Sequence, residues 1–395
     1  MNRRIILAGG GHAHLAVLAD WAEQPFPGTD RWLVTSSRHT AYSGMLPGWM
    51  AGIYRSEELL IDLEPLAEKA GAKLIIADVV GLDPACSTIT LSSGAALHFD
   101  LLSLAIGGET DASGLAALGE RLLPVRPVGA FVGRWSAALE GVARASVSSI
   151  AIVGGGAAGV ELALGAAVSV GQLADNARIT LVTPQEGFLS GHAPKARERA
   201  LKELENHNVT VRFAQAAGAE NGLLLSDGEF LAVDLVIAAT GSRAPSWLAR
   251  SGIACSADGF VAVGADLRSI SHSTILAAGD IIDRVDRDLE RSGVHAVKAG
   301  PVLAANLRAV ISGTDLSHYC PRNRTLYLLA LGDRRAIGSW GRFVATGHWV
   351  WRVKDWIDRR FVRHYTKPGS RAGGLHPDVP SLDDAPQSRP EGLLR

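Results

Sequence analysis

The amino-acid sequence predicts an α/β fold with two Rossmann-like domains, each a parallel sheet built from βαβ units. Two observations carry this prediction. A strand, a glycine-rich turn and a helix follow one another at residues 4–21, and the same succession returns at residues 149–164. Each unit also closes with an apolar strand that ends in small residues, at 99–108 and at 233–242. Near-continuous apolar strands are typical of parallel sheets buried on both faces, and one long-range repeat indicates a duplicated domain.

The first unit opens with the apolar strand 4–8 and a run of three glycines. A strand, a tight glycine turn and a helix start form the phosphate-binding part of a dinucleotide domain. The residues expected to contact a dinucleotide here are Gly9, Gly11, His12 and Ala13. His14 stands where the usual motif has its third glycine, so either the helix sits slightly off the strand or His14 points outward. Because His12 and His14 lack a third ligand, we expect no metal site.

The second turn, Gly154-x-Gly156-x-x-Gly159, matches the dinucleotide motif in full. The first glycine permits the tight turn, the second lets a pyrophosphate reach the backbone, and the third lets helix and strand pack closely. Ala157 opens the helix, whose N-terminus favours an anion. We therefore expect a second dinucleotide on this turn.

The residues after the second strand of each unit usually include a carboxylate that binds the adenosine ribose. The first unit has Thr35-Ser36-Ser37-Arg38 there, and the second has Thr183-Pro184-Gln185-Glu186. The candidate ribose contacts are Ser36, Arg38 and Thr183. Hydroxyl groups could replace the carboxylate, and Glu186 could reach the ribose, so the choice between NADH and NADPH stays open.

Composition and charge exclude several classes of protein. The 395 residues include 39 lysines and arginines against 40 aspartates and glutamates, a formal net charge of −1, which disfavours a nucleic-acid-binding protein. Cys86, Cys255 and Cys320 are far apart, which disfavours a disulfide framework, a cysteine zinc site and a dithiol redox centre. A reducing, cytoplasmic compartment fits them. We recognise no signal peptide and no apolar stretch of the roughly 18 residues that a spanning helix needs.

The end of the chain is basic and aromatic. Residues 331–367 contain nine lysines and arginines against three aspartates, a local charge of 9 − 3 = +6, together with four tryptophans. A basic, aromatic, amphipathic stretch is typical of a segment that lies on an anionic membrane. A homodimer interface, or packing on the chain's own first domain, are the alternatives. From Gly369 onward the composition indicates a disordered tail.

With its two dinucleotide turns and a late Gly279-Asp280 that follows a buried strand, the chain resembles the pyridine nucleotide-disulfide oxidoreductase superfamily, which has the glutathione-reductase-like fold. Within it, the sequence is most similar to the branch of type II NADH dehydrogenases and sulfide:quinone reductases. The segments 9–15, 38–48, 300–307 and 349–355 also resemble a subgroup found fused to or near selenophosphate synthetase. The resemblance covers residues 1–365.

The resemblance implies an FAD-binding domain made of residues 1–110 and 245–313, with an NAD(P)-binding domain, 111–244, inserted in it. Residues 314–367 would form a C-terminal region that contacts a membrane or a second copy, and residues 368–395 the tail. The FAD pyrophosphate would lie on the first glycine turn, the ribityl chain near Asp280, and the isoalloxazine against the loop Met45-Leu46-Pro47. The residues implied in FAD binding beyond the first turn are Met45, Leu46, Pro47, Val79, Gly107, Gly279, Asp280 and Lys298.

NAD(P)H would lie on Gly154, Gly156 and Gly159, with Glu161 and Gly241 lining the nicotinamide path. The resemblance also aims the helix around Lys298 at the pyrimidine end of the flavin, where its field and Lys298 would stabilise the anion formed on reduction. Lys298 and Glu161 are therefore the candidate catalytic residues. The alternative for Lys298 is a solvated helix residue.

Hydride passes from a nicotinamide to a flavin when the two rings stack, so the protein supplies alignment and electrostatics. Because the chain shows no paired cysteines, the favoured acceptor is a quinone or another small diffusible molecule. We therefore expect an FAD-dependent NAD(P)H dehydrogenase, cytoplasmic or peripheral on the inner face of the membrane. The alternative is a redox-responsive module that binds FAD and NAD(P)H and docks on a partner in selenium metabolism.

Overall fold

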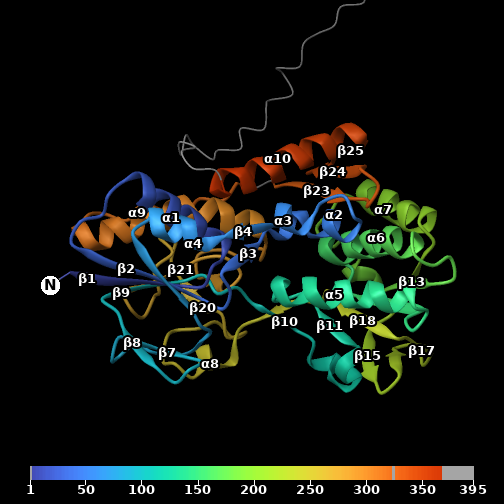
Figure 1. Ribbon diagram of the computed structural model, residues 1–395, viewed down its shortest axis with the longest axis horizontal. Helices are drawn as coiled ribbons and strands as arrows, with labels where there is room; N and C mark the ends of the chain where they lie inside the picture. The colour runs from blue at the N-terminus through green and yellow to red at the C-terminus, as the bar shows by residue number, and fades with distance from the viewer. Residues whose placement is uncertain (1, 323–324, 367–395) are drawn as a thin grey trace, which may run out of the picture.

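A computed structural model describes residues 2–322 and 325–366, and it has two parallel sheets side by side with a C-terminal layer across both (Figure 1). The predicted tail, 368–395, lies outside the described residues. The first sheet contains, in spatial order, β21 (Ile275–Ala277), β9 (Leu101–Leu104), β1 (Arg3–Ala8), β2 (Thr29–Thr35) and β5 (Ala72–Ile76). The second contains β11 (Leu122–Pro124), β18 (Leu235–Ala238), β12 (Ser149–Val153), β13 (Arg178–Thr183) and β14 (Val209–Phe213).

The two sheets confirm the duplication. The order β9-β1-β2-β5 in the first sheet corresponds to β18-β12-β13-β14 in the second, and all neighbours are parallel. The registers also correspond, since Leu7 pairs with Ser103 and Ile152 pairs with Ile237, each two residues before the first glycine of its turn. The closing strands therefore occupy the same place in both units, and every residue of β9 and β18 is buried, as expected of central parallel strands.

Helices cover these sheets. The first sheet carries α1 (His12–Glu23), α4 (Leu63–Lys69) and α9 (Gly293–Ser312), and the second is flanked by α5 (Val128–Ala143), α6 (Ala157–Gly171) and α7 (Pro194–Asn206). Helices α1 and α9 pack closely because Gly300 leaves room: a Cβ there would lie 2.7 Å from the Ala16 side chain and 3.0 Å from the Ala13 oxygen.

Short elements join and edge the two sheets. The chain leaves the first sheet at β10 (Glu109–Thr110) and returns at β19 (Ser242–Arg243), and these two segments pair with each other. The domain limits at 110 and 245 stay predictions. The remaining short strands are β3 (His39–Ala41), β4 (Leu60–Asp62), β6 (Val79–Asp83), β7 (Thr88–Leu91), β8 (Ala96–His98), β15 (Ala216–Ala219), β16 (Gly222–Leu225), β17 (Phe230–Ala232), β20 (Val261–Val263) and β22 (Ile282–Arg284). The short helices are α2 (Leu46–Met50), α3 (Ser56–Leu59) and α8 (Ser246–Ala249).

The C-terminal region is an antiparallel sheet of β23 (Leu326–Ala330), β24 (Ala336–Trp340) and β25 (Phe343–Gly347), followed by α10 (His348–Thr366). It contacts both other parts, since α10 packs on α3 and β4 while β23 and β24 pack on α6 and α7 (Figure 1). The buried face of α10 includes Val350, Trp351, Phe361 and Tyr365. One alternative, packing of this segment on the chain's own first domain, is therefore confirmed for one face of the helix.

Candidate functional site

The second glycine turn, between β12 and α6, has the geometry that its motif predicts. Gly154 has a φ of +123°, and a Cβ there would lie 2.3 Å from the Ala239 carbonyl oxygen. A Cβ at Gly159 would lie 1.8 Å from the Gly154 oxygen, so only glycine lets α6 pack this closely. By contrast, no atom of the described residues lies within 4 Å of a Cβ placed on Gly156. The start of α6 at Ala157 therefore borders free space, which suits the pyrophosphate of NAD(P)H.

The first turn differs at its third position. Gly9 has a φ of +99°, and Cβ atoms at Gly9 and Gly11 would lie 2.5 and 2.4 Å from the Ala105 oxygen. His14 is fully buried: its Nδ1 lies 2.6 Å from the Gly9 oxygen and its Nε2 lies 2.8 Å from the Ser103 hydroxyl. The expectation that His14 points outward is therefore wrong. The imidazole fits between the turn and β9.

Buried polar groups lie beside this first turn. His12 Nε2 and Ser292 Oγ have no hydrogen-bond partner within residues 2–322 and 325–366. Gly279, with a φ of +82°, turns the chain after β21 and presents Asp280, which pairs with Arg126 at 2.8 Å. Burial lowers the pKa of His12, and the charge of Asp280 opposes this. Because unsatisfied buried polar atoms are rare in folded proteins, this place fits a polar group such as the ribityl and pyrophosphate chain of FAD.

The loop expected against the isoalloxazine lies where three parts of the chain meet. Its three predicted contact residues, all buried, are Met45, Leu46 and Pro47. The Pro47 oxygen lies 2.9 Å from the position of a Cβ on Gly165 in α6. Tyr42 stacks on Phe361 of α10, with ring centroids 4.3 Å apart. The loop is therefore held by α6 and α10, and its contact to a flavin stays a prediction.

The predicted ribose contacts are largely occupied by other groups. Arg38 binds both carboxylate oxygens of Asp62, at 3.0 and 2.7 Å, and also pairs with Glu64 at 2.7 Å. Thr183 is buried, and its hydroxyl donates to the Pro184 oxygen at 3.1 Å. Ser36 is exposed and makes no hydrogen bond to another described side chain. The other strand-end candidates differ from these: Val79 opens β6 and is half-buried, and Gly107 and Gly241 have no described atom within 4 Å of a Cβ position.

A buried charged cluster lies under α10. Lys354 and Asp358 are 5% and 4% exposed, and the Lys354 Nζ donates to Asp358 at 2.7 Å and to the Gly44 oxygen at 2.7 Å. Glu161 of α6 accepts a hydrogen bond from the Ala330 N–H at 2.7 Å. Burial raises the pKa of Glu161 to about 7, although Lys354 and the Ala330 N–H act against this. Burial alone would lower the pKa of Lys354, but Asp358 and Glu161 raise it.

Sequence reasoning singled out Glu161 but missed Lys354, Asp358 and Arg126. Lys354 and Asp358 look like an ordinary surface pair one helical turn apart. Helical periodicity could have revealed that they are buried, because they lie between Val350 and Phe361 on the apolar stripe of α10. Arg126 follows a parallel strand at its carboxyl end, where ligands bind in such sheets.

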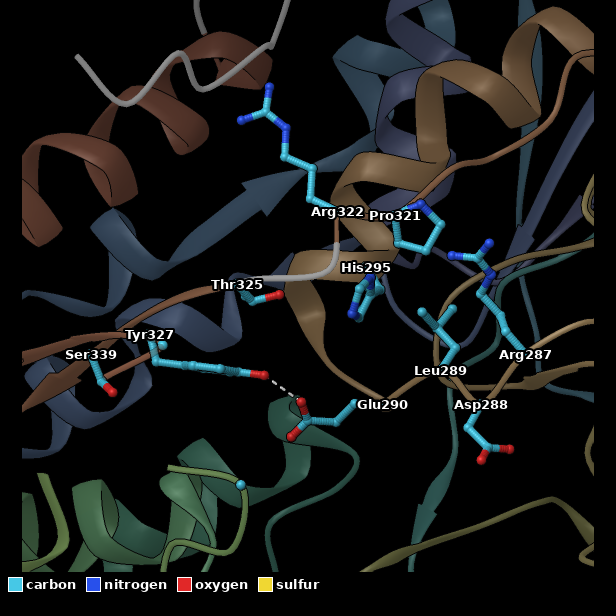
Figure 2. A pocket seen from close by; sticks show the side chains of 12 residues that line it. Arg287, Asp288, Leu289, Glu290, His295, Pro321, Arg322, Thr325, Tyr327 and Ser339 are labelled. Atoms are coloured by element: carbon cyan, nitrogen blue, oxygen red, sulfur yellow. Dashed lines mark hydrogen bonds between the residues drawn. The ribbon is translucent and has the colours of Figure 1, made fainter. Parts of the chain in front are cut away.

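A polar cavity of about 340 Å³ opens where the segment before α9, the start of β23 and the loop after β13 meet (Figure 2). Tyr327 donates a hydrogen bond to Glu290 across it, and His295 projects into it from the first turn of α9 (Figure 2). His295 Nδ1 lies 2.9 Å from the Tyr319 hydroxyl. His295 and Glu290 also line a smaller cavity that reaches Asp280. The larger cavity therefore lies next to the place that fits FAD.

Lys298, the second candidate catalytic residue, lies one turn further along α9 and is half-buried. Burial and the nearby Arg322 lower its pKa, and among the described residues it has no carboxylate partner. Lys298 does not line the larger cavity. In the part of the chain that the structure describes, no three His, Cys, Asp or Glu side chains gather as metal ligands would. The three cysteines are free.

Comparisons with known proteins agree with this geometry. The family model "Pyridine nucleotide-disulphide oxidoreductase" matches residues 3–300. An NADH dehydrogenase-like protein of Mycobacterium tuberculosis is 28% identical over 232 residues, which are 56% of this chain and 58% of that protein, so the chain spans little more than half the length of this relative.

Solved structures share the fold. The sulfide:quinone oxidoreductase of Aquifex aeolicus has a TM-score of 0.74 at 16% identity, covering 92% of each chain. NDH2 of Plasmodium falciparum, solved with NADH, has a TM-score of 0.77 at 13% identity, covering 93% of this chain and 99% of that one. With two dinucleotide turns, a place that fits FAD and a family match over three quarters of its length, the chain belongs to the pyridine nucleotide-disulphide oxidoreductase family, whose cofactors are FAD and NAD(P)H.

Proposed function

We propose that this protein is an NAD(P)H dehydrogenase that passes electrons through FAD to a quinone at the surface of a membrane. One observation carries the proposal, namely the two-faced helix α10. Its inner face brings buried charges to the junction of the FAD and NAD(P)H parts, and its outer face exposes aromatic and basic side chains. A quinone reductase needs both properties, because its acceptor comes from the lipid phase and takes up protons as it is reduced.

The NAD(P)H side of the reaction is assigned to the second turn. The open space at Gly156 and the start of α6 would hold the pyrophosphate. Bound FAD would supply the exchange of hydride for electrons. The residues of this chain would bind and align the two cofactors, with Asp280 and Arg126 beside the ribityl chain and the segment 42–47 against the ring.

The acceptor side needs two protons for each quinone that two electrons reduce to a quinol. Glu161 lies at the boundary of the two cofactor parts and, with a pKa raised to about 7 by burial, is half-protonated near neutral pH. A carboxyl group in this state can hold and release a proton at the working pH. The Lys354 ammonium beside it keeps a positive charge at the same place, which favours the anion formed before the second proton arrives.

The outer face of α10 would contact the membrane. Trp349 and Trp356 are 58% and 50% exposed, and the nearby hairpin residue Phe343 is 64% exposed. The exposed basic residues of the same region, which form no ion pair within the described residues, are Arg334, Arg342, Arg352, Arg360 and Arg363. No helix in the described ranges is long and apolar enough to cross a bilayer, so contact with a membrane would be made from its surface, on the cytoplasmic side.

The test is anaerobic reduction followed by reoxidation. FAD-loaded protein should be bleached by NADH or NADPH within seconds and should recover its yellow colour when a quinone is added. Glu161→Gln should slow the quinone step more than the reduction by the coenzyme, and the pH dependence of the quinone step near 7 should disappear. Protein that neither coenzyme reduces would end the dehydrogenase proposal. Protein that is reduced but reoxidised only by oxygen or sulfur species would end the quinone assignment.

Two further expectations rest on the sequence resemblance or the charge pattern alone. Docking on a partner in selenium metabolism would show as co-purification with selenophosphate synthetase. A homodimer through the outer face of α10 would compete with the membrane for the same residues, and sedimentation with and without vesicles separates the two.

A further inference from the structure

His14 stands in the first turn where the second turn has Gly159, and it makes a different kind of contact. In the second unit, Gly159 lets α6 approach the Gly154 oxygen directly. In the first unit, the equivalent carbonyl, that of Gly9, is met by the His14 Nδ1 at 2.6 Å. An imidazole hydrogen bond thus stands where the other unit has a close backbone contact.

Strand β9, beside the first turn, also differs from its counterpart β18 in the second unit. Ser103 of β9, which lies 2.8 Å from the His14 Nε2, occupies the register position that Ile237 holds in the second sheet. The first unit therefore has His14 and Ser103 at the two positions where the second unit has Gly159 and Ile237. Both His14 and Ser103 are fully buried, so neither side chain can find water as a partner.

The two contacts determine the proton positions of His14. A carbonyl oxygen only accepts, so Nδ1 must carry the hydrogen and donate to Gly9. In a neutral ring Nε2 is then an acceptor, and Ser103 donates to it. Burial lowers the pKa of His14 to about 4, which keeps the ring neutral near pH 7.

The two hydrogen bonds of His14 orient the backbone groups that face the cofactor. In a trans peptide the N–H of one residue points opposite to the carbonyl before it. With the Gly9 carbonyl held toward His14, the Gly10 N–H points away from α1 and β9, and it has no backbone acceptor among the described residues. Free amide groups of such a turn are the ones that bind a pyrophosphate.

We propose that His14 and Ser103 form a positioning pair that orients the first glycine turn for the FAD pyrophosphate. Neither residue touches the reacting atoms, and the pair acts through the Gly9 carbonyl. The inference concerns FAD binding and holds whichever acceptor the enzyme uses.

The test is FAD affinity of the apoprotein, measured by quenching of flavin fluorescence. His14→Leu, of similar size but without a donor, should weaken FAD binding at least tenfold, the effect of about one buried hydrogen bond. His14→Asn, whose amide can still donate near the Nδ1 position, should stay within about threefold of the wild type. Binding of NADH to the second turn serves as the internal control and should not change.

A second measurement keeps the proposal testable if His14→Leu does not fold. In protein labelled with ¹⁵N-histidine, His14 should show a slowly exchanging proton on Nδ1 and an unprotonated Nε2 between pH 6 and 8. Ser103→Ala should shift the Nε2 signal and weaken FAD binding several-fold. A proton on Nε2, or wild-type FAD affinity in either His14→Leu or Ser103→Ala, would overturn the proposal.

Discussion

Removal of the buried Lys354 charge should destabilise the protein strongly. In Lys354→Met the side chain keeps much of its length and apolar contact but leaves Asp358, 4% exposed, without the cation 2.7 Å away. The Gly44 oxygen also loses its donor. A buried charge pair that loses one partner costs more than the pair contributed, because the remaining charge stays out of water.

The magnitude can be worked in two ways. Removing one partner of a buried ion pair costs about 3–5 kcal/mol. Alternatively, Asp358 could take up a proton: moving a carboxyl from its ordinary pKa of about 3.9 to neutral at pH 7 costs about 4 kcal/mol, at 1.36 kcal/mol per pKa unit. The two values agree, and for a chain of this size they correspond to a melting temperature lowered by about 5 °C.

The assay is thermal unfolding of the apoprotein at pH 7 and pH 5. Because Asp358 is neutralised more easily in acid, the deficit of Lys354→Met should shrink by about 2–3 kcal/mol between these pH values. The double variant with Asp358→Asn should regain most of the loss, and the exposed Lys202→Met should change stability by less than about 0.5 kcal/mol. A Lys354→Met protein as stable as the wild type at pH 7 would refute the reasoning.

Three further predictions follow from the same geometry. Gly156→Ala should keep the melting temperature, because its Cβ meets no described atom, yet weaken NAD(P)H binding more than tenfold. The control Gly133→Ala, on an exposed face of α5, should leave NAD(P)H binding unchanged. Equal NAD(P)H affinity in both variants would contradict the assignment of the coenzyme to the second turn. The raised pKa of Glu161 means that its contribution to stability is full below pH 4.5 and is lost as the pH rises through 7. In urea unfolding, the free energy of unfolding of the wild type should therefore fall by about 3 kcal/mol over this range relative to that of Glu161→Gln. If the stabilities of the two proteins change in parallel with pH, the carboxyl group is not buried. Trp349→Ser with Trp356→Ser should weaken binding to anionic vesicles at least tenfold in a flotation assay, whereas undiminished flotation would assign the exposed face to another partner.

Much of the fold could be predicted from the sequence because it depends on local patterns of glycine and apolar residues. The glycine turns, the apolar strands and the spacing between them predict two parallel sheets, and the structure adds that the two sheets share a strand order. The structure brings Asp280, in the Gly-Asp turn after a buried strand, near His12 of the first turn, and its contact with FAD stays a prediction. These signals are local because each depends on backbone conformation or on burial within one βαβ unit.

The sequence by itself determined the duplicated α/β fold, the two dinucleotide turns and the basic, aromatic character of the C-terminal segment. Only the tertiary structure decided that His14 points inward, that Arg38 is engaged by Asp62, and that Lys354 is buried beside Glu161 rather than solvated. The physical reason is that burial and pairing of a polar side chain depend on what another element brings to it. Lys354 and Glu161 are 193 residues apart in the sequence (354 − 161) and meet only because α10 packs on both domains.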